Sequence, residues 1–304
     1  MNRFKRGLGM IVCIILTGGV LWGADSVSLI SEEYGASSRT SAMGSIQGLQ
    51  SESYSIFENP ASLPRDSRTY YSTYFMTLAD AQSSYFTASV AYPLDKKGHV
   101  ALGIAQKRSP NLDFSGADQN GEYVIASQFV VADTLFKLGY QQQLTDSLSL
   151  GLSAHYFVQD LYLTQGAGWN MDAGLWYNFG RVKVSATAKN MLGFSQMSYS
   201  NGYRTLNFPS EFVTSAQFDL TDYFKIYGQL RGEKLRRSVG VYVSPIPTLA
   251  FLGGIREVGS TGVQTQYSAG VMLNLGMMAL NFSYQNSQVV DYDGLYGISV
   301  DFHL

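Results

Sequence analysis

Residues 148–158 read LSLGLSAHYFV, and the spacing of their side chains decides the fold. Apolar side chains recur at every second position, and most positions between them hold small or polar residues. One face would carry Leu148, Leu150, Leu152, Ala154, Tyr156 and Val158, and the other Ser149, Gly151, Ser153, His155 and Phe157. A period of two residues is typical of a β-strand whose faces meet different environments. The stretch therefore predicts a strand with an apolar face and a mostly polar face.

Similar segments follow one another through most of the chain. We place fourteen of them, at residues 68–79, 82–93, 99–108, 130–144, 147–163, 168–179, 181–190, 208–220, 222–232, 236–244, 247–256, 263–275, 277–286 and 293–304. An even number of alternating segments of about ten residues is the signature of an outer-membrane barrel. Such a sheet must close on itself, because backbone groups in hydrocarbon need internal partners. We therefore predict an all-β fold, a transmembrane antiparallel β-barrel of about 14 strands, over residues 68–304.

The composition agrees with a barrel. Charged residues make up 14% of the 304-residue chain, against about 25% in an average soluble domain. No stretch after the N-terminus approaches the ~20 consecutive apolar residues of a transmembrane helix, which excludes a helical membrane protein. A secreted β-sandwich could share this composition, so the lengths of the connections have to decide between the two folds.

The connections between the expected strands alternate in length. The even-numbered ones are short, at residues 95–98, 145–146, 180, 221–222, 245–246 and 276. The odd-numbered ones tend to be longer, at residues 108–129, 191–207, 257–262 and 287–291, with 80–81 as an exception. Barrels in outer membranes have short periplasmic turns and longer external loops, whereas a sandwich has no reason to sort its loops in this way. We therefore expect an outer-membrane location, with the N- and C-termini on the periplasmic side.

The N-terminus reads as a secretory signal peptide over residues 1–24. Arg3, Lys5 and Arg6 precede an apolar run from residue 8 to residue 21, and a small-residue exit follows it. A permanent anchor helix is the alternative, but the apolar run is short for it. Cys13 lies inside this signal, so the mature chain would contain no cysteine and no disulfide. Its 18 basic and 23 acidic residues form no basic cluster, which excludes nucleic acid as a partner.

Residues 25–67 are expected to form a plug, or hatch, inside the barrel. Residues 36–63, ASSRTSAMGSIQGLQSESYSIFENPASL, do not alternate and are rich in small side chains. The stretch ends in Asn59, Pro60 and Ala61, where proline fixes its own φ and drives the preceding residue out of the helical region. We interpret these three residues as a turn that shapes the hatch, with gating as a second possible role.

Three motifs resemble the FadL superfamily of outer-membrane proteins, and within it the shorter PorV/PorQ and UPF0164-like branch. They are GASSRTSAMG at residues 35–44, IFENPASL at residues 56–63 and KNMLG at residues 189–193. The resemblance covers the whole layout of signal, hatch and strands. It implies a fourteen-stranded barrel that takes up hydrophobic small molecules, such as long-chain fatty acids, passively and without a cofactor. The expected partners are then outer-membrane lipid and the hydrophobic ligand. Members of the PorV/PorQ branch instead assist type IX secretion, so a non-transporting accessory or scaffold with secretion-system proteins as partners is the alternative.

Two groups of side chains are candidates for a site. Charged or titratable residues on the expected lumen face are Lys137, His155, Asp172, Lys183, Lys189, Asp219 and Arg256. They either pair with one another and the hatch, or a basic member holds a ligand carboxylate. Apolar residues in the expected external loop are Met191, Phe194, Met197, Tyr199 and Tyr203. This loop could capture ligand, dock a protein or anchor at the lipid interface.

We expect no enzymatic activity and no metal site. Residues 151–155, GLSAH, fail the G-x-S-x-G pattern of a nucleophile turn at the last position. Ser153 and His155 share the face that points inward, where a lumen hydrogen-bond network is the simpler interpretation. The three histidines lie on separate segments without the spacing of metal ligands.

Overall fold

The computed structural model describes residues 34–78, 83–95, 97–117, 123–161, 164–192, 196–200, 205–232, 236–258, 264–286 and 294–304. Three short helical segments come first: α3 (Ser38–Ala42), η1 (Ser53–Phe57) and η2 (Pro60–Ser62). The strands that follow are β1 (Tyr70–Leu78), β2 (Ser83–Pro93), β3 (Gly98–Ala117), β4 (Tyr123–Thr145), β5 (Leu148–Leu161), β6 (Thr164–Asn178), β7 (Val182–Lys189), β8 (Gln196–Tyr199), β9 (Thr205–Asn207), β10 (Glu211–Asp219), β11 (Phe224–Arg231), β12 (Arg236–Ile246), β13 (Leu249–Val258), β14 (Gln264–Asn274), β15 (Met278–Gln285) and β16 (Leu295–His303). No helix among the described residues is long and apolar enough to cross a membrane.

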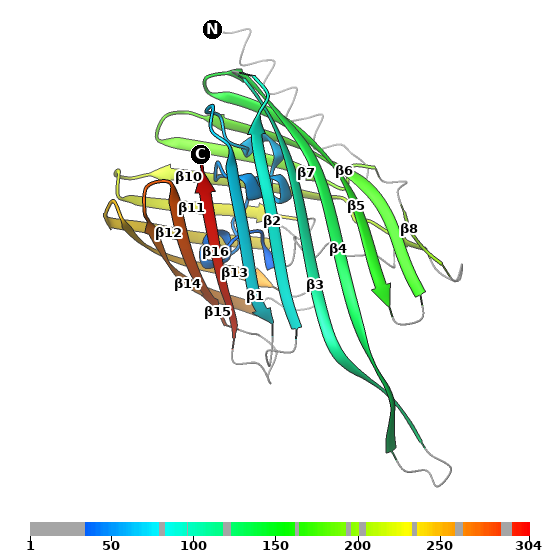
Figure 1. Cartoon of the computed structure of the whole chain (residues 1–304). Coiled ribbons are helices and arrows are strands. Elements are labelled where there is room, and N and C mark those ends of the chain that lie inside the picture. The colour runs from blue at the N-terminus through cyan, green and yellow to red at the C-terminus, as the bar shows by residue number, and fades with distance from the viewer. Residues whose placement is uncertain are drawn as a thin grey trace.

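Fourteen of the described strands form a closed antiparallel ring, which confirms the predicted barrel. The ring runs from β1 through β7 and from β10 through β16, each strand pairing with its neighbours (Figure 1). The first and last strands meet at Tyr70 and His303, and β5 pairs with β6 where the ring would otherwise be open. The strands of the ring therefore pair on both sides, so the ring leaves no free edge.

The two faces of the wall are those that the alternation predicts. Along β5, Leu150 and Leu152 are 42% and 55% exposed on the outside, whereas Ser153 and His155 are buried on the inside. The outer face carries apolar and aromatic side chains on many strands, among them Phe75, Phe86, Leu102, Phe136, Leu138, Phe251 and Phe282. The ring is thus apolar outside and mostly polar inside, as a barrel in a lipid bilayer requires.

The two ends of the barrel differ. One end carries the turns after β2, β4, β6, β10, β12 and β14 together with Leu304, whose backbone pairs with Thr69, and we call it the short-turn end. We call the opposite end the long-loop end.

At the long-loop end, the hairpin of β3 and β4 differs from the expectation. Most of residues 108–129, expected as a loop, belongs to β3 and β4, which extend beyond the other strands in Figure 1. Pro110 disguises this extension, because it lies in a break of register between Ser109 and Leu112, where a strand tolerates proline.

The expected loop at 191–207 also contains strand. β8 and β9 pair with each other, and β8 adds to the edge of β6 beyond the ring. Strands of four and three residues are too short for a period of two to stand out in the sequence.

Residues 34–67, which we call the N-terminal segment, lie inside the ring (Figure 1). Ser37 caps α3 by accepting a hydrogen bond from the Thr40 amide at 3.1 Å. Asn59 caps η2 by accepting one from the Ala61 amide at 2.9 Å, and Pro60 occupies the first helical position. Asn59 itself is extended, with φ of −148°, because the following proline disfavours the helical region.

Glycines in the wall let the N-terminal segment approach closely. A Cβ atom at Gly151 would lie 2.2 Å from the Pro60 carbonyl carbon, and one at Gly174 would lie 1.8 Å from Asn59 Oδ1. Real Cβ atoms do not approach other atoms so closely, so a side chain at either position would force the Asn59–Ala61 turn to shift. The Asn59–Ala61 turn is therefore seated directly against the backbone of β5 and β6.

Candidate functional site

A buried ion pair lies in the wall beside the lumen. Lys137 on β4 donates to the carboxylate of Asp172 on β6, and both side chains are almost fully buried. His155 Nδ1 on β5, between these two strands, lies 3.8 Å from Asp172 Oδ1. The backbone N–H of Asn190 also donates to Asp172 Oδ1, at 3.0 Å. The structure thus brings together three of the predicted lumen residues, Lys137, His155 and Asp172, around one carboxylate.

The KNMLG motif has a structural explanation at this cluster. Asn190 adopts a left-handed conformation with φ of 53°, which asparagine tolerates better than most residues. The Asn190 side chain donates to the Pro209 carbonyl at 2.9 Å, and Ser210 Oγ donates to the Asn190 backbone carbonyl at 2.8 Å. Asn190 therefore ends β7 and holds the return of the chain into β10.

Two further predicted lumen residues hold the N-terminal segment. Lys189 Nζ donates to Gln47 Oε1 at 2.8 Å, and Arg256 Nη1 donates to Ser45 Oγ at 2.8 Å. Arg256 also donates to Gln266 on the neighbouring strand β14. These contacts join the N-terminal segment to β7 and to β13 of the wall.

A buried carboxyl group organises the N-terminal segment itself. Glu58 accepts hydrogen bonds from Thr40 Oγ1 at 2.7 Å and from the Gly48 amide at 2.9 Å, so it joins α3 to the end of η1. Burial raises the pKa of Glu58 from 4.5 to about 7, because the charged form loses its hydration. The segment consequently contains a group that titrates near neutral pH.

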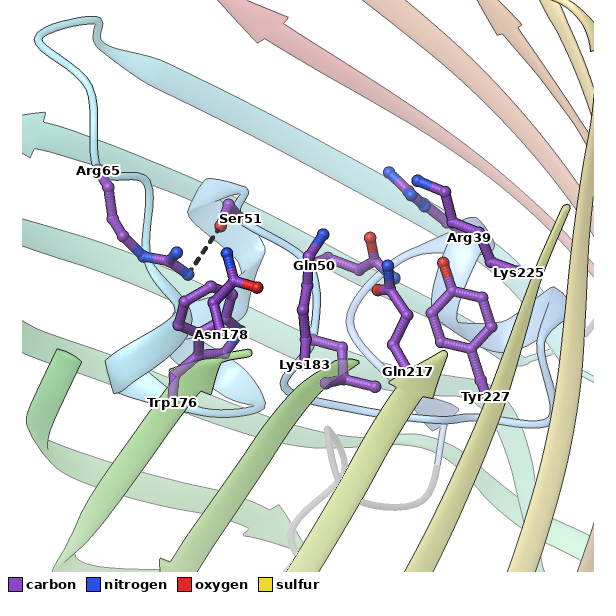
Figure 2. Close-up of a pocket in the computed structure, with 11 residues that line it drawn as sticks. Arg39, Gln50, Ser51, Arg65, Trp176, Asn178, Lys183, Gln217, Lys225 and Tyr227 are labelled. Atoms are coloured by element: carbon purple, nitrogen blue, oxygen red, sulfur yellow. Dashed lines mark hydrogen bonds between the residues drawn. The ribbon is translucent and has the colours of Figure 1, made fainter. Parts of the chain in front are cut away.

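The remaining two lumen residues lie at the short-turn end. Lys183 lines a cavity of about 220 Å³ between the N-terminal segment and the wall (Figure 2). Asp219 lies beside it and accepts a hydrogen bond from Gln217 Nε2 at 2.6 Å. Three other basic side chains, Arg39, Arg65 and Lys225, line the same cavity.

The predicted external-loop residues divide between two environments. Met191 is half exposed, as expected of a loop residue. Met197, however, is fully buried, because β8 folds against β6 and turns this side chain into the apolar lumen cluster with Phe157 and Phe208. Tyr199 packs against that cluster and donates to Gln159 Oε1 at 2.6 Å. Met197 therefore does not belong to an exposed capture surface, and Phe194 and Tyr203 lie outside the described residues.

The arrangement contains no recognisable catalytic or metal centre in the described part of the chain. Ser153 Oγ donates to Asp172 Oδ2 at 3.3 Å rather than to His155, and Asp172 is itself paired with Lys137. No group of three histidine, cysteine, aspartate or glutamate side chains among the described residues could hold a metal ion. The buried ion pair and the aromatic residues of the lumen are suited to binding and positioning.

Sequence reasoning did not find several residues of this site. Arg39, Glu58 and Arg65 belong to the N-terminal segment, which has no period that assigns its side chains to a face. Trp176 on β6 and Lys225 on β11 follow the alternation of their strands, but two other strands lie between them in the sheet, so their proximity to one cavity is not visible in the sequence. The charged residues of this segment are about as frequent as in the rest of the chain, so composition gave no signal for them.

Comparison with known proteins identifies the architecture. No family model matches the chain, and no curated protein matches it. The structure is similar to that of the toluene transporter TodX of Pseudomonas putida, with 11% identity and a TM-score of 0.63 over 89% of this chain and 98% of that one. It is also similar to the monoaromatic hydrocarbon channel CymD, with 12% identity and a TM-score of 0.61 over 91% and 99% of the two chains. The chain therefore has the fold of these β-barrel channels.

Proposed function

We propose that the chain is an outer-membrane barrel of the FadL superfamily that conducts hydrophobic small molecules passively, without a cofactor or a chemical reaction. The observation that carries this proposal is a closed barrel whose lumen is occupied by a folded N-terminal segment. A general porin keeps a water-filled channel. A lumen that is occupied by the N-terminal segment favours a route that opens for selected molecules when this segment moves.

The character of the lumen supports a hydrophobic ligand. Toward the long-loop end, the buried aromatic side chains Tyr85, Phe157 and Phe208 belong to one apolar cluster with Phe57 of the N-terminal segment. Aromatic rings of this kind offer large apolar contact surfaces to a ligand without charge. TodX and CymD, which share the fold, are a toluene transporter and a monoaromatic hydrocarbon channel. Long-chain fatty acids and monoaromatic hydrocarbons are accordingly the two ligand classes to test.

The orientation follows from the ends of the barrel. We place the short-turn end and both termini in the periplasm, and the long-loop end outside, since outer-membrane barrels keep their longer loops external. The ligand would enter from the long-loop end and pass the N-terminal segment after this segment moves. Met191, which is half exposed, remains a candidate for the first contact with ligand.

Flux into vesicles tests the proposal. The full chain is reconstituted into vesicles, and entry of a labelled fatty acid, of toluene and of a hydrophilic sugar is measured, with protein-free vesicles as the control. The full chain should admit the hydrophobic probes and exclude the sugar, whereas a variant lacking residues 36–63 should admit all three. Absence of hydrophobic flux in both forms would refute transport. It would favour the non-transporting secretion accessory, a role that co-purification with secretion proteins would then test.

A further inference from the structure

The cavity at the short-turn end is built from two separate parts of the chain (Figure 2). Arg39, Gln50 and Arg65 come from the N-terminal segment, whereas Trp176 and Lys183 come from the ends of β6 and β7 that meet at their turn. Lys225 and Tyr227 of β11 complete the wall side. Its volume of about 220 Å³ is below the roughly 300–1,000 Å³ of sites for drug-sized ligands. The cavity therefore fits a small molecule or the head group of a larger one.

The lining of this cavity is strongly basic. It contains Arg39, Arg65, Lys183 and Lys225, and no aspartate or glutamate among the described residues. Two carboxyl groups lie just outside the lining. Asp219 interacts with Lys183, and Glu52 interacts with Arg39. Burial raises the pKa of Glu52 to about 8, so this group is largely uncharged at neutral pH. The cavity thus holds four positive charges against little more than one negative charge.

Hydrogen-bond donors around the cavity also lack acceptors. Trp176 is more than nine-tenths buried, and its indole Nε1 has no hydrogen-bond partner among the described residues. Arg65 Nε has none either. Buried donors are nearly always satisfied in folded proteins, so a cluster of unpaired ones indicates an acceptor that is supplied from outside the chain. The basic side chains beside these donors favour an acceptor that is negatively charged.

The donors are held in place before any ligand arrives. The Arg65 guanidinium carbon lies 3.1 Å from the centre of the Trp176 ring, on which it stacks, and Arg65 Nη2 donates to Ser51 Oγ at 3.2 Å (Figure 2). A guanidinium fixed on one face presents its remaining N–H groups as a planar fork, which suits two oxygens of one carboxylate or phosphate. Lys183 and Lys225, on the wall strands, then supply compact positive charges.

We propose that this cavity binds a small oxyanion, either a free phosphate-type ion or the carboxylate head of a small amphipathic molecule. The bound oxygens would bridge Arg65 of the N-terminal segment to Lys183 of the wall, and Arg39 and Lys225 of the same lining would add positive charge (Figure 2). Occupancy would therefore fasten the segment to the barrel at the short-turn end. This inference depends on the barrel and its inner segment, and not on transport through them.

Fluorescence of Trp176 reports binding directly. Trp22 lies in the predicted signal peptide, so Trp169→Phe leaves Trp176 as the one tryptophan of the mature chain. This protein, in an uncharged detergent at constant ionic strength, is titrated with sodium phosphate, sodium octanoate and octanol. A saturable change is expected with at least one of the two anions and none with octanol, which has the same chain without the charge. Phosphate alone identifies a free ion, octanoate alone a head group, and a response to both identifies the shared chemistry.

Substitutions at Lys183 locate the response. Lys183→Gln should weaken anion binding by about tenfold, the value of one hydrogen bond to a charged group. Lys183→Arg should retain binding, and Lys97→Gln, which removes an exposed charge from another turn at the same end, should leave it unchanged. Far-ultraviolet circular dichroism verifies that each variant folds. A flat titration with both anions, or equal affinities in Lys183→Gln and Lys97→Gln, overturns the proposal. Because binding is measured in detergent, this failure is distinct from a failure of flux.

Discussion

Replacing Gly151 by alanine should loosen the N-terminal segment while leaving the barrel closed. The new Cβ atom would lie 2.2 Å from the Pro60 carbonyl carbon and 2.3 Å from the Ala61 nitrogen. Carbon atoms in contact rest about 3.5 Å apart, so the turn would have to retreat by roughly 1 Å. The obstacle is backbone on both sides, which cannot rotate away as the end of a side chain can.

The size of the effect follows from this overlap. Overpacking of a well-packed core costs about 1–3 kcal/mol. That cost falls on the seated state alone, because a displaced segment no longer meets the methyl group. The equilibrium between seated and displaced states should therefore shift by about 5- to 150-fold toward displacement.

Hydrogen exchange measures this shift. Amide protection of residues 53–63 should fall by that factor in Gly151→Ala, while protection in the barrel strands stays close to that of the wild type. Gly228→Ala is the matched control, since this glycine also lies in a strand and its added Cβ would have no atom within 4 Å. Equal protection of residues 53–63 in the two variants would show that the close approach of Gly151 to the backbone of Pro60 and Ala61 does not hold the segment in place.

Three further predictions concern charge, pH and the outer face. Asp172→Asn leaves the buried Lys137 without its counter-ion, so the barrel should lose about 3–5 kcal/mol of stability, and an unchanged urea midpoint would contradict this. Glu58 has a pKa of about 7 in the seated segment against 4.5 when free, so its stabilising contribution is complete below pH 4.5 and is lost as the pH rises through 7. Amide protection of residues 34–63 should therefore fall between pH 5 and pH 8 in the wild type beyond the change seen in Glu58→Gln, and parallel curves for the two would exclude this role. Leu138→Lys places a charge on the lipid-facing wall and should cost about 2–4 kcal/mol of folding free energy in vesicles, whereas Leu94→Lys in an exposed turn should cost about 0–1 kcal/mol, and equal costs would argue against a buried outer face.

The strands of the wall could be predicted because the alternation of apolar and polar side chains is a pattern within each strand. The alternation at residues 148–158 placed Leu150 outside and Ser153 inside, and the same rule located all fourteen strands of the ring. Among the mid-strand glycines, Gly151 and Gly174 meet the N-terminal segment, whereas Gly228 faces outward.

What could not be predicted depends on contacts between distant segments. The basic cavity draws Arg65 from the N-terminal segment, Lys183 from β7 and Lys225 from β11, and no spacing in the sequence relates these positions. Met197 is expected in an exposed loop because residues 191–207 separate two alternating segments, but pairing of β8 with β6 turns it inward. The extension of β3 and β4 was hidden for a local reason, since Pro110 and a break of register interrupt the alternation.

A reversible cross-link between the N-terminal segment and the wall tests the proposed route most directly. Ser53 Oγ and Ser72 Oγ lie 2.9 Å apart, close enough for cysteines at both positions to form a disulfide, whose sulfurs are about 2.0 Å apart. Cysteines at Ser83 and Ser109, whose hydroxyl oxygens are also 2.9 Å apart, cross-link two wall strands and serve as the control. Oxidation of Ser53→Cys/Ser72→Cys should abolish the entry of a labelled hydrophobic probe into vesicles, reduction should restore it, and the control pair should conduct in both states. Undiminished entry through the oxidised Ser53→Cys/Ser72→Cys protein would contradict the claim that the N-terminal segment must move for a ligand to pass.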